Sequence, residues 1–551
     1  MPFASPFPNL DIPKVDLLSY LFPADKTPSD TPIWIDAHNP SNYLTPKQLL
    51  GWVKRLGVGL EKLGTQKGDA IVIFTPNHIF VPVAYLGIAG TGRVFSGLNP
   101  GYTVLETAHQ LRNTGAKAVF VHPSLAETAL KAAKQIGLSS DRVFLFSDEP
   151  NAPAHGIQDW RSMLGSQEEG DRYQWHRMSE DEATTTLATV NYSSGTTGLP
   201  KGVSVSHFNV LANLEQTMFM RFHEIKNRTP ERWLGFLPLY HAYGQLYTIV
   251  MALRLEIPVY IMKQFHYEDF LGVIERFRIT NLQIAPPILI MLSKRSETSK
   301  YDLSSLTHIL CGAAPLSKEL QNEVANRFKV QINQGWGMTE TVAGAHHVPG
   351  GIRDSSGSVG QLFPNCECKL VDDDGKEVAP GEPGEMYIRG PQVCIGYWRN
   401  KAATEEAISP DGWLKTGDVA IVSKEGWFWI VDRKKELIKV NALQVAPAEL
   451  EAVLLENDDV ADAAVVGITL NDEEWPRAYV HLKDHAKGKV TADDIHKFMK
   501  NRVAKHKRLV GGIAFVDEVP KLPSGKIVRK LLKEWSKRDA VAMEGKPRPK
   551  L

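Results

Sequence analysis

Short apolar segments alternate with segments of helical periodicity along most of this chain, and that alternation restricts the folds it can adopt. The apolar segments read AIVIF at 70–74, AVFVH at 118–122 and RVFLF at 142–146, with NLQIA and HILCG further on. Such short, strongly apolar runs are typical of strands buried on both faces, and strands that alternate with helices form parallel sheets. The sequence therefore predicts α/β architecture.

One helix is predicted with a defined start. Thr45 is a favourable N-cap residue, and Pro46 occupies the first helical position after it. The apolar residues that follow have helical spacing: Leu49, Trp52, Val53, Leu56 and Leu60. This pattern predicts an amphipathic helix with one face in the core.

At 551 residues the chain is too long for one hydrophobic core. The pattern changes near Asp432: AVVGI, AYVHLKD, a helix opened by Thr491 and GIAFVDEVP then follow closely. We expect a large N-terminal domain of packed α/β subdomains at 1–431 and a small, mobile α+β C-terminal domain at 432–551.

Charge and cysteine content exclude several classes of protein. Lysine plus arginine and aspartate plus glutamate both number 63, which leaves no basic excess for nucleic acid or anionic membranes. The four cysteines form no C-x-x-C pair and no disulfide pattern, which fits a reducing compartment and argues against structural zinc. The sequence predicts a soluble protein with no membrane span, no obligate protein partner and a small-molecule substrate.

The two chain ends bear on localisation. The N-terminal segment has three prolines within MPFASPFPNLDIPKVDLL and no signal-peptide pattern. The C-terminal segment, KPRPKL, approximates the peroxisomal Ser-Lys-Leu address, with Pro549 in the place of serine. The sequence is therefore compatible with either a peroxisomal or a cytoplasmic localisation.

The stretch YSSGTTGLPKGV, residues 192–203, gathers hydroxyl side chains, glycines and one lysine. Glycine lets backbone N–H groups approach an anion, and hydroxyls and an ammonium add further donors, so the stretch indicates phosphate binding. A polar surface turn is the alternative. Pro200 and Gly202 exclude the common G-x-x-x-x-G-K-[ST] phosphate loop.

Eight segments together resemble one family. They are YSSGTTGLPKGV (192–203), LPLYHAYG (237–244), CGAAPL (311–316), QGWGMTET (334–341), GWLKTGD (412–418), VDRKKELIK (431–439), QVAPAELE (444–451) and LPSGKIVRK (522–530). In this order and spacing the chain resembles the adenylate-forming superfamily, in particular its 4-coumarate and aryl or medium-chain acyl-CoA ligases. The resemblance implies that a carboxylate attacks the α-phosphate of ATP and releases pyrophosphate, and that the acyl group of the resulting acyl-adenylate is then transferred to coenzyme A with release of AMP.

The resemblance also implies which residues bind ATP. Such an enzyme positions reactants and stabilises charge, and it needs no covalent nucleophile of its own. The implied ATP-binding residues are Ser193, Ser194, Gly195, Thr196, Thr197, Lys201, Gly312, Ala313, Ala314, Gln334, Gly335, Trp336, Asp418 and Arg433. Trp336 would stack on the purine, although a core tryptophan is equally open, and Asp418 would accept both ribose hydroxyls.

Four residues are implied in catalysis: Lys526, His241, Glu340 and Thr339. Lys526 would bridge the carboxylate and the phosphate of ATP from the small domain. Glu340, with the hydroxyl of Thr196, would hold Mg²⁺, which prefers oxygen ligands. His241 would gate between the half-reactions, and a buried structural histidine is the alternative.

By the same resemblance, six residues would line the acyl site: Tyr243, Tyr247, Gly335, Gly337, Ala343 and Gly344. Small residues at four of these positions are interpreted as room for an aryl or medium-length acyl group. Tyr247 stands where related ligases often have a small residue, and it would shorten or redirect the pocket.

The coenzyme A side departs from the family pattern. The implied residues are Lys439, Asn441, Ala442 and Gln444, with Asp432 and Lys435 as the hinge of a domain rotation. Family members carry glycine and phenylalanine at 442 and 443, and lysine in the place of Gln264; here Lys263 is shifted by one. An adenylating enzyme that uses an amine or carrier-protein thiol, and a non-catalytic nucleotide- or acyl-binding protein, are the alternatives.

Overall fold

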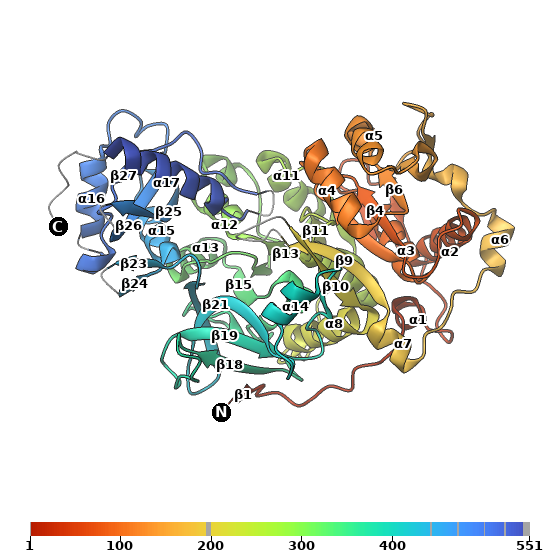
Figure 1. Cartoon of the computed structure of the whole chain (residues 1–551), viewed down its shortest axis with the longest axis horizontal. Coiled ribbons are helices and arrows are strands. Elements are labelled where there is room, and N and C mark those ends of the chain that lie inside the picture. Colours follow the sequence, from red (N-terminus) through yellow and green to blue (C-terminus); the bar gives the residue numbers. More distant parts are fainter. Residues whose placement is uncertain are drawn as a thin grey trace.

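The computed structural model describes residues 2–193, 200–440, 443–470, 473–500, 502–522 and 525–543. The predicted α/β class is confirmed, with two large mixed sheets in the N-terminal part and a third, small sheet in the C-terminal part. In Figure 1 the C-terminal elements, in blue, form a lobe at the left, opposite the orange strands β4 and β6 at the right. Within these described ranges, no helix has both the length and the apolar character that a membrane span requires. The C-terminal Pro549, Lys550 and Leu551 lie outside the described residues.

The first large sheet contains three of the strands predicted from apolar runs. Its order is β20 (Gly396–Tyr397), β10 (Lys201–Ser206), β9 (Leu187–Ser193), β5 (Val94–Leu98), β4 (Ala70–Phe74), β6 (Ala118–Val121), β7 (Val143–Leu145) and β8 (Gln158–Asp159). From β9 to β8 neighbouring strands are parallel, whereas β10 pairs antiparallel with β9 and with β20. The parallel prediction is therefore correct for its centre.

The second large sheet is built from strands of both halves of the large domain. Its order is β1 (Phe3–Ala4), β18 (Glu367–Val371), β19 (Gly384–Arg389), β21 (Leu414–Val422), β22 (Trp427–Arg433), β17 (Gly360–Leu362), β16 (His346–His347), β15 (Gln331–Trp336), β14 (His308–Cys311), β13 (Asn281–Ile284), β11 (Trp233–Gly235), β12 (Val259–Ile261), β2 (Trp34–Asp36) and β3 (Tyr43–Leu44). The predicted strands NLQIA and HILCG are β13 and β14, and they are parallel neighbours.

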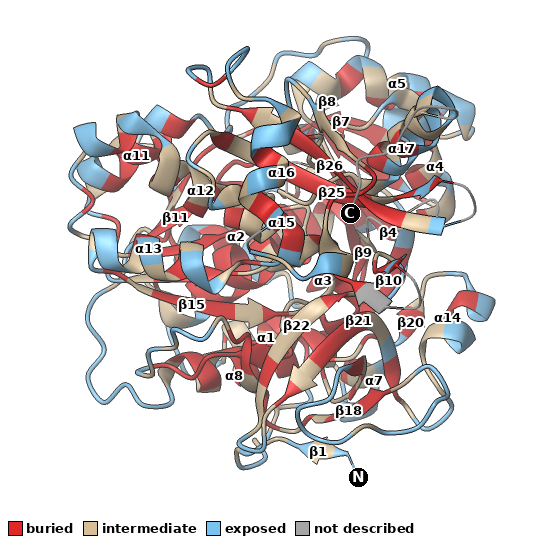
Figure 2. Cartoon of the chain, turned by 90° about the vertical axis from the view of Figure 1, so that its left-hand side faces the viewer, coloured by how far each residue is buried: buried red, intermediate tan, exposed pale blue. Residues whose placement is uncertain are grey.

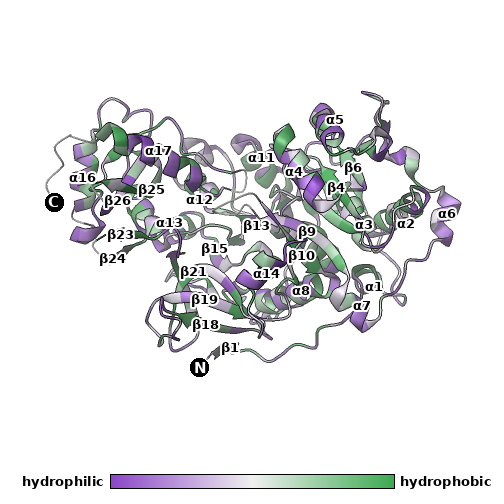
Figure 3. Cartoon of the chain, in the orientation of Figure 1, coloured by the Kyte–Doolittle hydropathy of each residue, from purple (hydrophilic) through white to green (hydrophobic). Residues whose placement is uncertain are grey.

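Helices cover both faces of these sheets. The predicted helix is α2 (Pro46–Lys62), where the side chains of Thr45 and Gln48 form a reciprocal capping box. The helix α3 (Val81–Ala89) is buried at every position, as expected for a helix that is apolar on all sides. The helices α11 (Tyr267–Phe277), α12 (Pro286–Lys294) and α13 (Lys318–Phe328) enclose a separate core against the second sheet. In Figure 3, β4 and β6 are mostly in hydrophobic colours, whereas α4 (Val104–Thr114) and α5 (Ala126–Gln135) beside them carry hydrophilic ones.

The small C-terminal part has its own core, as predicted for an α+β unit. It contains the sheet of β25 (Val460–Leu470), β26 (Glu473–Leu482) and β27 (Ile513–Phe515), and a hairpin of β23 (Ile438–Val440) and β24 (Leu443–Val445). Its helices are α15 (Pro447–Leu455), α16 (Ala492–Lys500) and α17 (Arg529–Met543). Figure 2 shows β25 and β26 as buried strands, with exposed residues along α16.

Candidate active site

The two described ends of the predicted phosphate loop lie side by side. Ser193 ends β9 and Lys201 begins β10, and the two residues are paired in the antiparallel ladder. Lys201 is exposed, and its Nζ lies 5.0 Å from the centre of the Tyr397 ring. Ser194, Gly195, Thr196 and Thr197 lie outside the described residues. The pairing of β9 with β10 thus places Lys201 opposite Ser193, the last described residue before the loop.

Glu340 is a buried carboxylate with one aromatic partner. It lies in a short turn, Thr339–Thr341, and its Oε1 accepts a hydrogen bond of 2.7 Å from the hydroxyl of Tyr397 in β20. Burial raises the pKa of the Glu340 carboxyl, and the hydrogen bond from Tyr397 opposes that rise. Among the described residues no lysine or arginine forms an ion pair with Glu340. The family resemblance does not name Tyr397, and nothing in the sequence around it indicates this contact.

This carboxylate fits a magnesium ion. A buried, unneutralised carboxylate gains from a divalent cation, and Mg²⁺ in ATP-dependent sites is often held by one or two carboxylates together with substrate phosphates. In the described part of the chain, no three His, Cys, Asp or Glu side chains form a group that could bind a metal alone. A magnesium ion that is held jointly by Glu340 and by phosphate oxygens of ATP would match the donors present.

The segment after Glu340 is strained. Val342 has φ +64° and ψ −64°, and the N–H of Ala343 donates to the carbonyl of Thr341 across 2.8 Å. This is a tight turn in a conformation that β-branched residues avoid. Backbone strain of this kind is retained where the surrounding structure holds a functional segment in place. Thr339, which is 9% exposed, is held at the start of the same turn.

Asp418 is fixed by two partners from different strands. The indole N–H of Trp336, at the end of β15, donates to its Oδ2 across 2.8 Å, and Nε of Arg433 lies 3.4 Å from its Oδ1. Arg433 is also its register partner on β22. Burial raises the pKa of the Asp418 carboxyl, and the Arg433 charge and the Trp336 hydrogen bond oppose that rise. The Trp336 ring is packed against His346 in the core, so it acts at least as a support for Asp418.

The GAAPL segment, residues 312–316, follows the end of β14. Ala313 has φ +71°, a backbone conformation that favours glycine and that residues with a Cβ rarely adopt. Gln334 is buried, and its Nε2 donates to the carbonyl of Leu316 and to Oε1 of Gln321. Gln334 therefore ties this segment to α13, while Gly312, Ala313 and Ala314 stay half-buried at the surface of the site.

Lys526 reaches the site from the small domain. The turn that carries it touches the large domain: a Cβ placed on Gly525, which has φ +81°, would lie 2.9 Å from Cγ of Pro287. Burial and the charge of Arg433 lower the pKa of the Lys526 ammonium, and the carboxylates of Glu340 and Asp418 raise it. The lysine thus lies within electrostatic reach of groups on β22, β21 and the Thr339–Thr341 turn. Pro523 and Ser524 lie outside the described residues.

His241 precedes the short helix α9 (Ala242–Gly244). Its pKa is lowered to about 3, first by burial and then by the positive charge of Lys526. The imidazole is therefore neutral at the pH of ordinary assays in this arrangement. The structure brings His241 and Lys526 together, although they are far apart in the sequence.

The acyl residues are only partly arranged as the sequence suggests. Tyr243 donates from its hydroxyl to the carbonyl of Leu310 across 3.2 Å, and its ring lies 5.2 Å from that of Tyr247. The interpretation of small residues as open space is wrong at Gly337, where a Cβ would lie 1.7 Å from the carbonyl oxygen of Ala343. Gly344 is likewise covered, because a Cβ there would lie 3.1 Å from the ring of Phe363. Close packing of neighbouring segments requires both glycines.

Gly335 is less tightly enclosed than these two. A Cβ on it would lie 3.2 Å from the carbonyl oxygen of His346 and 3.6 Å from Cδ1 of Leu310. These contacts are looser than the 1.7 Å at Gly337, so Tyr243, Tyr247 and the Gly335 backbone are the predicted acyl residues that stay candidates for contact with an acyl group.

The hinge residues occupy different environments. Asp432 is 3% exposed, and its carboxylate accepts hydrogen bonds from the N–H groups of Arg433 and Ala448 at 2.7 and 3.1 Å. Burial raises the pKa of Asp432 to about 6. Lys435 is exposed, and its carbonyl accepts from Lys533. Because β22 extends to Arg433, residue 432 still pairs with the large sheet, and the boundary there stays a prediction.

Two of the residues expected to contact coenzyme A, Lys439 and Gln444, lie on the small-domain hairpin. Lys439 and Gln444 are register partners across β23 and β24, and Lys439 is exposed. Asn441 and Ala442 lie outside the described residues. Lys263, the shifted lysine, contacts the carboxylates of Asp148 and Asp36 at 2.6 and 3.3 Å. Its charge is therefore already balanced.

A lysine outside the family motifs joins the two domains. Nζ of Lys294, at the end of α12, donates to the carbonyls of Leu455, Asn457 and Val460, the last at 3.0 Å. These carbonyls lie at and beyond the C-terminal end of α15, where free acceptors attract a cation. Nothing in the sequence pattern indicates this contact, because it depends on how the domains meet.

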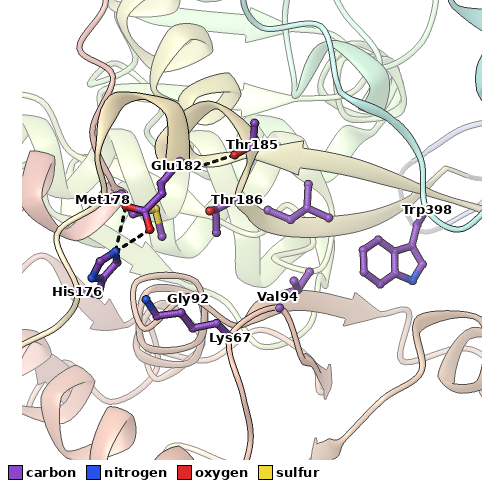
Figure 4. A pocket seen from close by; sticks show the side chains of 11 residues that line it. Lys67, Gly92, Val94, His176, Met178, Glu182, Thr185, Thr186 and Trp398 are labelled. Carbon is purple, nitrogen blue, oxygen red and sulfur yellow. Dashed lines mark hydrogen bonds and ion pairs between the residues drawn. The ribbon is translucent and has the colours of Figure 1, made fainter.

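A separate pocket lies away from this chemistry (Figure 4). It is lined in part by Lys67, Leu187 and the ion pair of His176 and Glu182, whose atoms are 2.9 Å apart. Its lining runs from Leu187, at the start of β9, to Trp398, whose backbone N–H donates to the carbonyl of Gly202 in β10, and it includes none of the predicted site residues.

The sequence matches the family of AMP-binding enzymes over residues 23–398 and its C-terminal domain over residues 449–526. It is similar to phenylacetyl-CoA ligase epaB of Aspergillus niger, with 35% identity over 96% of this chain and 98% of the relative. It is also similar to 4-coumarate-CoA ligase 1 of Narcissus pseudonarcissus, with 32% identity over 96% of each chain.

Solved structures have the same fold. The anthranilate CoA ligase AuaEII in complex with anthranoyl-AMP superimposes with a TM-score of 0.86 at 23% identity, over 96% of this chain and 99% of that one. ATP-bound MatB from Rhodopseudomonas palustris superimposes with a TM-score of 0.81 at 24% identity, over 95% and 99% of the chains.

Proposed function

Because the chain belongs to the family of AMP-binding enzymes and is an AMP-forming acyl-CoA ligase, we propose that it activates an aryl, arylalkanoic or medium-chain carboxylic acid. One observation carries this proposal. Lys526 of the small domain shares one electrostatic environment with Glu340, Asp418 and His241 of the large domain. Such a mixture of acids, a half-buried ammonium and a neutral imidazole suits the activation of a carboxylate by ATP.

The residues divide the task as follows. Lys201 and the loop after Ser193 would bind the β- and γ-phosphates, and Asp418 would accept from the ribose hydroxyls while Trp336 and Arg433 hold it in place. Lys526 would bridge the incoming carboxylate and the α-phosphate as negative charge develops between them. Glu340 would hold Mg²⁺, which supplies charge neutralisation at the phosphates. Neutral His241 would lie beside the carboxylate of the acid and, because it carries no charge, would not compete with Lys526 for that carboxylate.

Coenzyme A is the proposed acceptor, through Lys439, Gln444 and the residues between them. A rotation at Asp432 and Lys435 would exchange Lys526 for this hairpin at the site. The departures at Asn441, Ala442 and Gln264 bear on this half-reaction alone, since none of them lies among the residues proposed to bind ATP.

The test is pyrophosphate release from ATP and Mg²⁺ with a panel of acids that includes phenylacetic, 4-coumaric and octanoic acid, each with and without coenzyme A. We expect AMP and an acyl-CoA thioester, identified by mass spectrometry, from at least one class. Formation of an acyl-adenylate that coenzyme A does not consume would contradict the proposed acceptor, and hydroxylamine trapping would then reveal the unused adenylate.

A further inference from the structure

Two buried amide side chains lie on the face of the second sheet that carries the acyl residues. Gln283 on β13 and Asn333 on β15 are in register with Leu310, which lies between them on β14. Successive side chains of a strand point to opposite faces, and the adjacent Ile332 packs into the core against α11–α13. Leu310 belongs instead to the core that contains Tyr247, so Gln283 and Asn333 share that face.

A buried arginine approaches the same face from the end of α8 (His207–Phe222). Arg221 is 4% exposed, and its Cζ lies 5.0 Å from the centre of the Trp233 ring. That ring in turn lies 6.2 Å from the ring of Tyr247. The charge of Arg221 acts on both Tyr243 and Tyr247: it lowers the pKa of each hydroxyl and so opposes the larger rise caused by burial. The guanidinium therefore belongs to the surroundings of the proposed acyl site.

These three side chains have hydrogen-bond donors without a partner. Among the described residues, no acceptor is bonded to Nε or Nη1 of Arg221, Nε2 of Gln283 or Nδ2 of Asn333. The orientation of Asn333 is set, because its Oδ1 accepts from Nε2 of Gln331 across 3.2 Å. Buried donors normally find partners, and a donor left without one is costly. We call Arg221, Gln283 and Asn333 the donor cluster.

The donor cluster has little net charge. Nη2 of Arg221 forms an ion pair with Glu231, which also accepts from the indole N–H of Trp233. Burial lowers the pKa of the neighbouring His347 to about 4, so this imidazole is neutral. A second carboxylate buried here would therefore meet no uncompensated positive charge to offset the cost of its desolvation. An uncharged acceptor would satisfy the donors without the cost of burying a charge.

The position of the donor cluster suits the far end of an acyl group. Asn333 precedes Gly335 on β15 by two residues, which corresponds to about 7 Å along the strand. The carboxylate would lie near Gly335, His241 and Lys526 in the proposed function. A chain that runs from there along the sheet brings its remote carbon atoms to the donor cluster.

We infer that the acid carries an uncharged, hydrogen-bond-accepting oxygen, a ketone carbonyl, at the end remote from its carboxylate, and that Asn333, Gln283 and Arg221 select for it. This inference rests on the proposed function and narrows its substrate class. A ketone oxygen has two lone pairs and can accept hydrogen bonds from these donors. The donor cluster thus determines specificity and takes no part in the chemical step.

The experiment compares three acids of equal chain length on the full chain: octanoic acid, 7-oxooctanoic acid and octanedioic acid. We expect kcat/KM for 7-oxooctanoic acid to exceed that for octanoic acid at least about tenfold, because a site built to donate rejects an analogue that lacks the acceptor. The substitution Asn333→Leu should bring the ratio of the two kcat/KM values to within about twofold. Asn322→Leu, on the outer helix α13, is the matched control and should leave the ratio unchanged.

The outcomes separate this inference from the proposed function. Equal kcat/KM for the keto acid and octanoic acid would mean that water occupies the donors, and would overturn the inference. A preference for octanedioic acid would contradict the inference that the accepting group of the substrate is uncharged. If no acid in either panel supports turnover, the proposed function fails, and calorimetric binding of 7-oxooctanoic and octanoic acid in the presence of AMP still tests the donor cluster. If the ratio of kcat/KM for 7-oxooctanoic acid to that for octanoic acid stayed unchanged in Asn333→Leu, Asn333 would not select for the keto oxygen.

Discussion

The indole of Trp336 and the carboxylate of Asp418 form a hydrogen bond of 2.8 Å between two strands that are not neighbours in the second sheet. The bond joins the end of the parallel part of that sheet, on β15, to its antiparallel part, on β21. The proposed nucleotide site lies where these two parts meet. The orientation of Asp418 therefore depends on the packing of the whole sheet, and it can be tested from either partner.

Trp336→Phe keeps an aromatic ring and removes the donor to Asp418. A hydrogen bond to a charged group contributes about 1.5–3 kcal/mol, so we expect KM for ATP to rise about tenfold. Pyrophosphate exchange at varied ATP concentration measures this. The apparent KM for the acid should change little, and a larger effect on the acid than on ATP would contradict the assignment of Asp418 to the ribose.

Lys526→Ala should abolish most of the adenylation step. Loss of a charged donor that acts in the transition state costs on the order of 3 kcal/mol, or roughly a hundredfold in rate. Single-turnover adenylate formation measures the effect, with Lys530→Ala, an exposed lysine on α17, as the control. Transfer to coenzyme A from a preformed acyl-adenylate should be retained. A loss below tenfold would exclude the role of Lys526.

Tyr397→Phe removes the hydroxyl that donates to Glu340. A hydrogen bond contributes about 1 kcal/mol, so we expect the Mg²⁺ concentration for half-maximal activity to rise about fivefold. Glu340→Gln should have a much larger effect on the same titration. An unchanged magnesium dependence in both variants would place the metal elsewhere.

Lys294→Met removes the cation that joins α12 to the end of α15 while its apolar stem is kept. This contact joins the small domain to α12 in the orientation that places Lys526 at the site. Its loss should cost about 1.5 kcal/mol, so we expect the rate of adenylation to fall about tenfold. Transfer to coenzyme A, for which we propose another orientation of the small domain, should be unaffected. Lys300→Met, at an exposed position, is the control. Equal losses in both half-reactions would indicate general destabilisation.

His207 makes the stability of the fold depend on pH. Its Nδ1 accepts from the N–H of Leu17 across 3.1 Å, and burial lowers its pKa to about 4. The unfolded chain binds a proton at this residue below about pH 6.5, and the folded chain does so only near pH 4, so stability is lost as pH falls between these values.

The variant His207→Asn tests this dependence, because asparagine supplies an acceptor and does not titrate. Its melting temperature should fall less steeply than that of the unsubstituted chain between pH 6.5 and pH 4. His481→Asn, in the small domain, is the control. Parallel curves for His207→Asn and the unsubstituted chain would refute the contribution of His207.

Local patterns in the sequence were sufficient for individual elements and for the family. The apolar runs became β4, β6, β7, β13 and β14, because a buried strand needs only a short apolar segment. Thr45 and Pro46 start α2 as predicted, since a cap depends on residues within one turn. The eight motifs indicated the reaction, because each is a contiguous segment whose residue types its chemistry requires.

Contacts between distant segments were decided only by the tertiary structure. Gly337 was interpreted as open space, yet the carbonyl of Ala343 fills it, because a tight turn returns the chain to that point. The hydrogen bond of Tyr397 to Glu340 and the contact of Lys294 with the end of α15 join segments that no sequence period relates. The sequence by itself thus determined which groups the site contains, and the folding of two sheets and a small domain onto one another decided which of them meet. Burial gives the physical reason: it depends on the whole chain, and it sets both the free donors of Asn333 and the lowered pKa of Lys526.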